Sequence, residues 1–117
     1  MLHRLRSIWS TEGRLESEPF EKLHLEPTWT GHAPNSERFG QIGSMPVRRF
    51  FPWVGVEDTQ ANVLWGAQLA IASSWQIEAY RKGDEAHLSG GIADREFGQW
   101  FKHIAPGKSF AAPTAIV

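Results

Sequence analysis

The chain has 117 residues, enough for one hydrophobic core but too few for a catalytic barrel of about 250 residues. Hydrophobic residues make up 41% and charged residues 21%, so the composition is that of a globular protein and excludes a disordered chain. Twelve Lys and Arg against thirteen Asp and Glu give a net charge of -1, which excludes the strongly basic surface of a non-specific nucleic-acid or anionic-membrane binder.

The chain contains no cysteine, which excludes disulfides, zinc ribbons and a thiol nucleophile. No apolar run approaches the roughly 20 residues that span a bilayer, and the first residues lack the apolar stretch of a secretory signal. We therefore expect a cytoplasmic protein with no membrane or nucleic-acid partner. No internal repeat or linker interrupts the sequence, so residues 1–117 are expected to form a single domain.

The N-terminal third has the weakest pattern. Residues 4–9 and 14–18 are compatible with strands, and residues 21–27 are expected to be irregular or extended. Residues 28–38 contain Gly, Pro, Asn and Ser, which favours a loop.

The middle of the chain alternates with a period of two. Val47–Val56 is expected to be extended, with Pro52 restricting it to a sheet edge, a bulge or a strand end. A turn at Glu57–Gln60 then leads into a strand that starts near Asn62. Its larger side chains fall on one parity and are expected to face the core: Val63, Trp65, Ala67, Leu69 and Ile71.

A second alternating strand covers Trp75–Arg81, and the polar, glycine-containing residues 82–85 after it predict a tight reversal. The pair is therefore expected to be antiparallel. Ala86–Ser89 is typical of a further short strand, which Gly90 and Gly91 should break or bulge.

The C-terminal part begins with an ambiguous segment. Asp94–Ile104 fits one or two helical turns or a strand, and the alternation of Phe97, Gln99 and Phe101 favours the strand. Ala105–Lys108 has the Pro-Gly order of a type II turn, and residues 109–117 are expected to be extended. Both ends carry apolar residues without a polar cap, as in a segment cut from a longer chain. Together these patterns predict an all-β, antiparallel β-sandwich.

Catalytic and metal-binding motifs are weak. The histidines lack the i, i+4 helical spacing of a zinc site, and neither a GxGxxG nor a P-loop motif occurs, so no metal or cofactor is expected. Gly43-Ser44 lacks the second glycine of a nucleophile elbow, which leaves serine catalysis without support. The carboxylate pairs Glu57-Asp58 and Asp94/Glu96 are interpreted as solvated turns. No catalytic residue is predicted.

The chain has six tryptophans and seven phenylalanines, whose large side chains must either be buried in the core or be exposed on a binding surface. Trp65 and Trp75 are expected in the core. Trp29, in the polar loop, and Trp53, beside a proline, are the candidates for exposure: they would stack on a sugar face or pack against a neighbouring domain. The pair Arg48 and Arg49 is a candidate for the same surface, and its alternative interpretation is a solvated charge pair.

A family resemblance rests on the order of several short motifs. The run Trp65-Gly-Ala-Gln-Leu-Ala-Ile-Ala-Ser-Ser-Trp75 is followed by Gly91-Ile92, Phe97, Trp100 and then Ala105-Pro-Gly-Lys-Ser-Phe110 with Pro113. This order resembles the second half of the N-terminal β-sandwich of the family 36 glycoside hydrolases, the α-galactosidases. Leu2-His3 with Trp9 and the Phe50-Phe51 pair are similar to earlier segments of that domain. The likeness is densest over residues 50–113.

The resemblance departs at residues 40–49, where relatives carry a Ser-Ser-His-Gln-His stretch, so it implies a divergent branch of the family. It implies a galactose mutarotase-like supersandwich of which this chain is the later part. The parent enzyme would be a retaining glycosidase that hydrolyses terminal α-galactosides with two aspartates of a (β/α)8 barrel, and neither aspartate matches a residue of this sequence. The implied partners are that barrel and further copies in a homo-oligomer.

Two functional hypotheses follow. In the first, the chain is the non-catalytic sandwich portion of an α-galactosidase and packs on its barrel. In the second, it is a free-standing carbohydrate-binding module that binds galactosides through Trp29 and Trp53.

Overall fold

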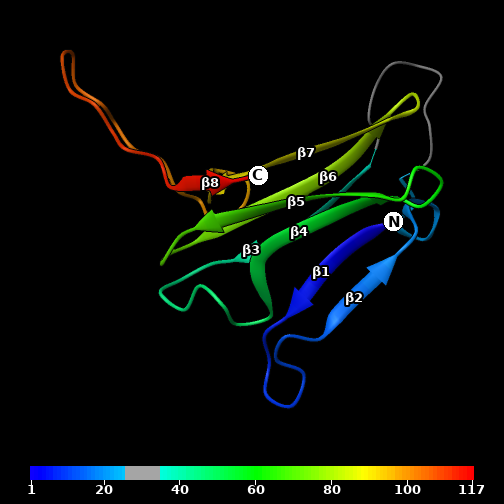
Figure 1. Cartoon of the computed structure of the whole chain (residues 1–117). Coiled ribbons are helices and arrows are strands. Elements are labelled where there is room, and N and C mark those ends of the chain that lie inside the picture. The colour runs from blue at the N-terminus through cyan, green and yellow to red at the C-terminus, as the bar shows by residue number, and fades with distance from the viewer. Residues whose placement is uncertain (26–34) are drawn as a thin grey trace.

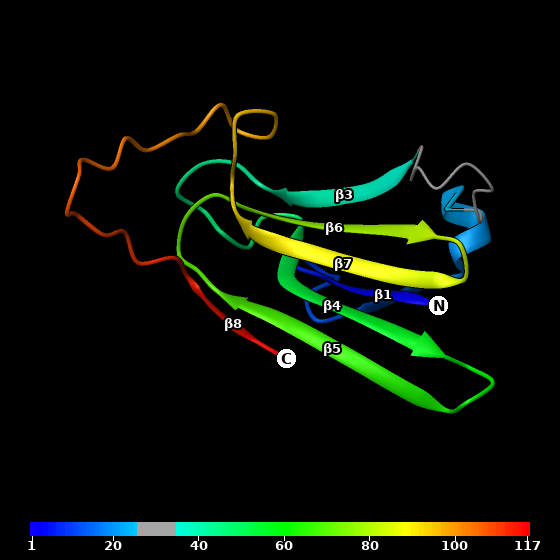
Figure 2. The ribbon, with the colours of Figure 1, turned by 90° about the horizontal axis from the view of Figure 1, so that it is seen from above.

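The computed structural model describes residues 1–25 and 35–117. Within these residues, eight strands form two antiparallel sheets that face each other (Figures 1 and 2). The five-stranded sheet has the order β2-β1-β4-β5-β8 and the three-stranded sheet the order β3-β6-β7. The elements are β1 Leu2–Arg6, β2 Leu15–Glu18, the 3-10 helix η1 Phe20–Leu23, β3 Ser36–Gln41, β4 Phe50–Asp58, β5 Val63–Ala70, β6 Trp75–Lys82, β7 Glu85–Ile92 and β8 Thr114–Ile116. The predicted all-β, antiparallel sandwich is confirmed.

Strand β6 follows the predicted alternation closely. Trp75, Ile77 and Ala79 are buried, and the residues between them are only partly covered. The following reversal is a two-residue loop, because Lys82 pairs with Glu85 and Gly83 has a φ of 59°. Strand β7 then continues through Gly90 to Ile92 in unbroken register with β6, so the predicted break or bulge at the glycines is wrong. A Cβ at Gly90 would lie 3.1 Å from Cγ1 of Ile77, and glycine therefore permits close packing there.

Pro52 lies within the central strand β4, at one of the places that the sequence allowed. The register between β1 and β4 shifts between the pairs Arg4↔Val54 and Arg6↔Phe50, and this irregularity includes Pro52. Pairing with β5 starts only at Trp53. The bulge therefore accommodates a residue that has no N–H to donate to the ladder.

The core is formed where β4 packs against β3 and β6. Phe39 is at its centre, with its ring centroid 5.4 Å from that of Phe50 and 5.9 Å from that of Trp75, both in edge-to-face geometry. The Trp75 indole N–H donates to the carbonyl of Pro46, so the largest buried side chain has its polar group satisfied. The remaining core residues are Leu2, Phe20, Leu25, Val54, Leu69, Ile77 and Ala79.

Several expectations for the less regular segments are wrong. Residues 36–38, expected in a loop, belong to β3, and residues 20–23 form η1. The Asp94–Ile104 segment contains no strand, because the Asp94 side chain accepts the N–H of Phe97 at 2.7 Å and bends the chain. The Ala105–Lys108 turn is confirmed by its closing hydrogen bond of 3.0 Å and by the φ of 77° at Gly107. Within residues 109–117, which are expected to be extended, Thr114–Ile116 pairs with β5 as β8.

Candidate functional site

A cleft of about 820 Å³ lies at one end of the sandwich. The β4–β5 turn, the β6–β7 hairpin and η1 come together at this end, as Figure 2 shows on its right side. The lining residues come from both sheets and from the helix: Met1, Phe20, Glu21, Val56–Gln60, Trp65, Arg81 and Asp84–Leu88. A volume of several hundred Å³ is typical of a small-molecule site.

One side of the cleft is apolar, and Trp65 is its largest side chain. Trp65 shares its parity along β5 with the buried Leu69, so it is on the side of the sheet that faces the other sheet. Its side chain is nevertheless 53% exposed, which makes the predicted core position wrong. Val56 and Leu88 continue the apolar lining from β4 and β7.

Polar groups surround the opening. The Asp58 carboxylate accepts the N–H groups of Gln60 at 2.9 Å and Ala61 at 3.1 Å, which fixes the β4–β5 turn. Arg81 donates to Glu21 at 3.2 Å and ties the β6–β7 hairpin to η1. Four carboxylates, those of Glu21, Asp58, Asp84 and Glu85, face two cations, the Arg81 guanidinium and the Met1 ammonium, so the electrostatic potential of the cleft is negative and disfavours anions.

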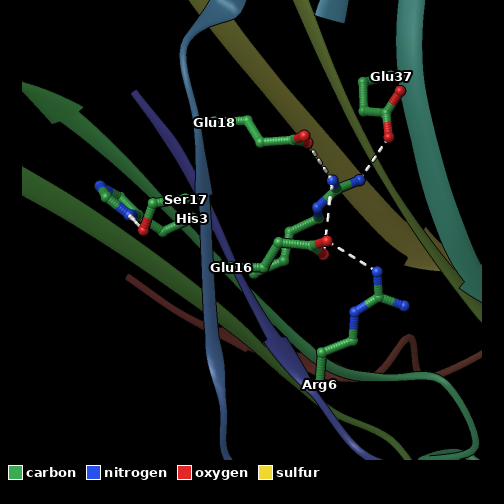
Figure 3. A network of polar contacts seen from close by, with 7 residues as sticks. His3, Arg6, Glu16, Ser17, Glu18 and Glu37 are labelled. Atoms are coloured by element: carbon green, nitrogen blue, oxygen red, sulfur yellow. Dashed lines mark hydrogen bonds and ion pairs between the residues drawn. The ribbon is translucent and has the colours of Figure 1, made fainter. Parts of the chain in front are cut away.

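A buried arginine joins the two sheets. Arg4 of β1 pairs with Glu18 of β2 at 2.8 Å and with Glu37 of β3, while Arg6 pairs with Glu16 at 2.7 Å (Figure 3). Only 8% of the Arg4 side chain is exposed. Because its guanidinium bonds carboxylates from both sheets, the network fixes how they face each other.

His3, Ser17 and Glu57 form a second polar row, on the other face of the five-stranded sheet. Ser17 Oγ is 2.8 Å from His3 Nδ1, and Glu57 Oε2 is 3.0 Å from His3 Nε2. Figure 3 shows His3 and Ser17 on the side away from the arginine network. The three residue types match those of a hydrolytic triad, but they come from neighbouring strands in register, and Ser17 does not line the cleft described above. We interpret the row as cross-strand pairing.

The site residues that the sequence predicts lie away from the cleft or outside the described residues. Trp29 is outside the described residues. Trp53 is half-buried on the outer face of the sheet, where its indole crosses two glycines: a Cβ at Gly55 would lie 2.9 Å from the ring, and one at Gly66 3.8 Å away. Arg48 and Arg49 are exposed. The structure brings neither arginine nor Trp53 to the cleft, and their role as a sugar or domain surface stays a prediction.

Arg49 instead contributes to a cluster of guanidinium groups around one core ring. Its Cζ lies 5.3 Å from the Phe50 ring centroid, and those of Arg4 and Arg6 lie at 5.1 and 4.5 Å. These are cation–π distances, so the three arginines stabilise the outer rim of the core.

The second surface that stands out is an extended arm, which we define as residues 101–112. All of its residues are exposed, including Phe101, Ile104 and Phe110, and Figure 1 shows it projecting far from the two sheets. Its base is a turn held by Asp94, which accepts hydrogen bonds from Gln76 Nε2 and the Phe97 N–H, each at 2.7 Å. These bonds lower the pKa of the Asp94 carboxyl, with the Gln76 bond as the largest cause.

Comparison with protein-family models, curated proteins and solved structures finds no match to this chain. Within residues 1–25 and 35–117, no group of three or more His, Asp or Glu side chains is placed to hold a metal ion. The same residues include no helix long and apolar enough to cross a membrane.

Proposed function

We propose that this chain is a non-catalytic β-sandwich portion of an α-galactosidase and that it packs on the (β/α)8 catalytic domain of that enzyme. The observation that carries the proposal is the arm, residues 101–112, which presents large apolar side chains outside the core. Exposed apolar surface of this kind is typical of a protein contact, because its burial removes it from water.

The chemistry of the arm suits an interface better than a solvated loop. The Trp100 and Phe110 ring centroids are 5.8 Å apart, and Lys102 Nζ lies 5.1 Å from the Phe110 centroid. On the same segment, Arg95 Cζ lies 4.9 Å from the Phe101 centroid. Aromatic side chains and arginine are enriched at protein interfaces. A partner that covers the arm would bury this apolar area. The rings already contact each other in the free chain, so little ordering of side chains would be needed on binding.

The identity of the partner rests on the family resemblance. The Ala105-Pro-Gly-Lys-Ser-Phe110 motif, which in the α-galactosidases leads into the barrel, forms most of the arm. The likeness therefore supplies the class of partner, and the arm supplies a surface for it. The proposal assigns bond cleavage to the barrel, and it includes homo-oligomer assembly of the parent enzyme through the same kind of apolar contact.

The first test compares the purified 117-residue protein with an arm variant, Phe101→Ser/Ile104→Ser/Phe110→Ser. Light scattering after size-exclusion chromatography should give a mass above that of one chain for the unaltered protein, and it should bind the apolar dye ANS. The arm variant should be monomeric and bind less dye. The matched control is Ile8→Ser/Trp9→Ser, because these side chains are also exposed but lie in the turn between β1 and β2.

A monomer without dye binding, or equal changes in the arm variant and the control, would contradict the packing role. The second test is enzymatic. The 117-residue protein should not hydrolyse a chromogenic α-galactoside, whereas a product extended in frame through a barrel-length segment should hydrolyse it. Hydrolysis by the 117-residue protein alone would contradict the assignment of chemistry to the barrel.

A further inference from the structure

The cleft at the end of the sandwich is separate from the arm and has the features of a ligand site. It lies at the turn end of β4, β5, β6 and β7, whereas the arm starts after the opposite end of β7. We propose that this cleft binds a neutral mono- or disaccharide, with one face of the sugar ring against the Trp65 indole. This binding does not depend on the packing role of the arm.

The apolar part of the argument is the position of Trp65. An indole buried in a core has no free face, but half of this side chain is exposed while it lines a concave surface. Pyranose rings present a face of C–H groups, and an aromatic ring in a cleft removes that face from water. Val56 and Leu88 extend the same apolar surface on the β4 and β7 sides.

The polar part is the set of groups at the rim. The hydroxyls of a sugar are donors and acceptors, and the cleft supplies carboxylate, amide and hydroxyl groups at Asp58, Thr59 and Gln60 from one turn. Asp84 and Glu85 supply carboxylates from the facing hairpin. These groups converge on one opening because both turns close at the same end of the sandwich.

Charge selects the class of sugar. Four carboxylates, those of Glu21, Asp58, Asp84 and Glu85, surround the cleft, and only two lining cations, the Arg81 guanidinium and the Met1 ammonium, oppose them. Arg81 pairs with Glu21, and Glu85 lies 3.5 Å from His87, so Asp58 and Asp84 leave the rim with a net negative charge. A carboxylated or sulfated sugar would therefore be repelled, whereas neutral hydroxyls can donate to the carboxylates. The cleft volume of about 820 Å³ holds one or two sugar rings.

The test is calorimetric titration of the 117-residue protein with methyl α-galactoside, methyl α-glucoside, maltose, melibiose and galacturonate, followed in parallel by tryptophan fluorescence. We expect saturable binding of at least one neutral sugar and none of galacturonate. Trp65→Ala should weaken that binding by about tenfold or more. Trp9→Ala is the matched control, because its side chain is 95% exposed and does not line the cleft, and it should leave binding unchanged.

A second variant guards against loss of folding in Trp65→Ala. Ala86 is exposed and lines the cleft, so Ala86→Phe should fill the site and abolish binding while the circular dichroism spectrum is retained. The proposal is overturned if no neutral sugar in the panel saturates the protein. It is also overturned if galacturonate or the diamine putrescine binds in preference to the sugars, or if both cleft variants bind as the unaltered protein does. Variants of the arm should not affect the titration, so failure of either proposal can be recognised separately.

Discussion

Trp75 and Trp65 both belong to the inward-facing set of an alternating strand, but their surroundings in the folded molecule are very different. Each is a tryptophan on the inward parity of an eight-residue strand, but Trp75 is 0% exposed and Trp65 is 53% exposed. Trp75 lies where β3, β4 and β6 pack together, whereas Trp65 lies at the open end of the sandwich. An inward direction buries a side chain only where an opposing layer covers it.

The largest expected effect is that of Trp75→Ala. The substitution removes the ring that packs on Phe39 and the hydrogen bond to the Pro46 carbonyl. We expect it to lower the free energy of unfolding by about 3–5 kcal/mol, the range for large aromatic side chains in cores. Urea denaturation followed by circular dichroism measures the change. A loss no larger than that of Trp65→Ala would mean that the two positions do not differ as described.

Arg4→Met is expected to have the next largest effect. It keeps the aliphatic length but leaves Glu18 and Glu37 without their shared partner between the sheets. The carboxylates are about one third exposed and keep some hydration, so we expect a loss of about 2–3 kcal/mol, below that of a fully buried broken pair. Arg6→Met, which removes the less buried partner of Glu16, is the control and should cost less. If the two variants had the same urea concentration at the midpoint of unfolding, the proposed role of Arg4 in linking the two sheets would be contradicted.

A smaller, pH-dependent effect is expected at the base of the arm. The pKa of Asp94 is lower in the folded chain than in the unfolded one, so ionised Asp94 contributes stability that is present above about pH 4 and lost as the pH falls through the folded pKa. The protection factors of the Phe97 and Trp100 amides, which correct exchange for its intrinsic pH dependence, should therefore fall as the pH is lowered through the folded pKa. Asp94→Asn should reduce this pH dependence, and protection factors that are unchanged by both treatments would contradict the role of the carboxylate.

The smallest expected effect on stability is that of Trp65→Ala. Because half of the side chain is already in water, its removal should lower the free energy of unfolding by no more than about 2 kcal/mol. The same urea experiment measures it beside Trp75→Ala. A loss of several kcal/mol would show that Trp65 is a core residue in solution and would remove the apolar wall of the proposed sugar site.

Much of the fold could be predicted from local pattern. The alternation at Trp75–Arg81, the turn at residues 82–85 and the possible bulge at Pro52 each depend on neighbouring residues, and each is confirmed. Strand β3 was missed because Ser36–Arg38 follow a stretch with loop composition, and their pairing with β6 compensates for that composition. The Asp94–Ile104 segment was misjudged because a side-chain acceptor at Asp94 competes with strand pairing.

The candidate site was harder to predict than the fold. Trp53 was favoured because it follows Pro52, yet its ring rests on glycines of β4 and β5 that are opposite each other only after the strands pair. The alternation of its strand predicts a core position for Trp65. The signal that places it differently is its position only two residues after β5 begins at Val63, next to the β4–β5 turn. The cleft requires the β4–β5 and β6–β7 turns to meet, and no single segment encodes that meeting.

The sequence by itself therefore determined the periods, turns and bulge that make this chain an antiparallel β protein, because these depend on interactions between near neighbours. Only the tertiary structure decided which inward faces are covered, which arginine joins the sheets and where the cleft opens. Those features depend on the pairing of β1 with β4 and of β3 with β6, and on how the two sheets oppose each other. The physical reason is that burial and ion pairing are set by distances between residues far apart in the chain, which a local pattern does not contain.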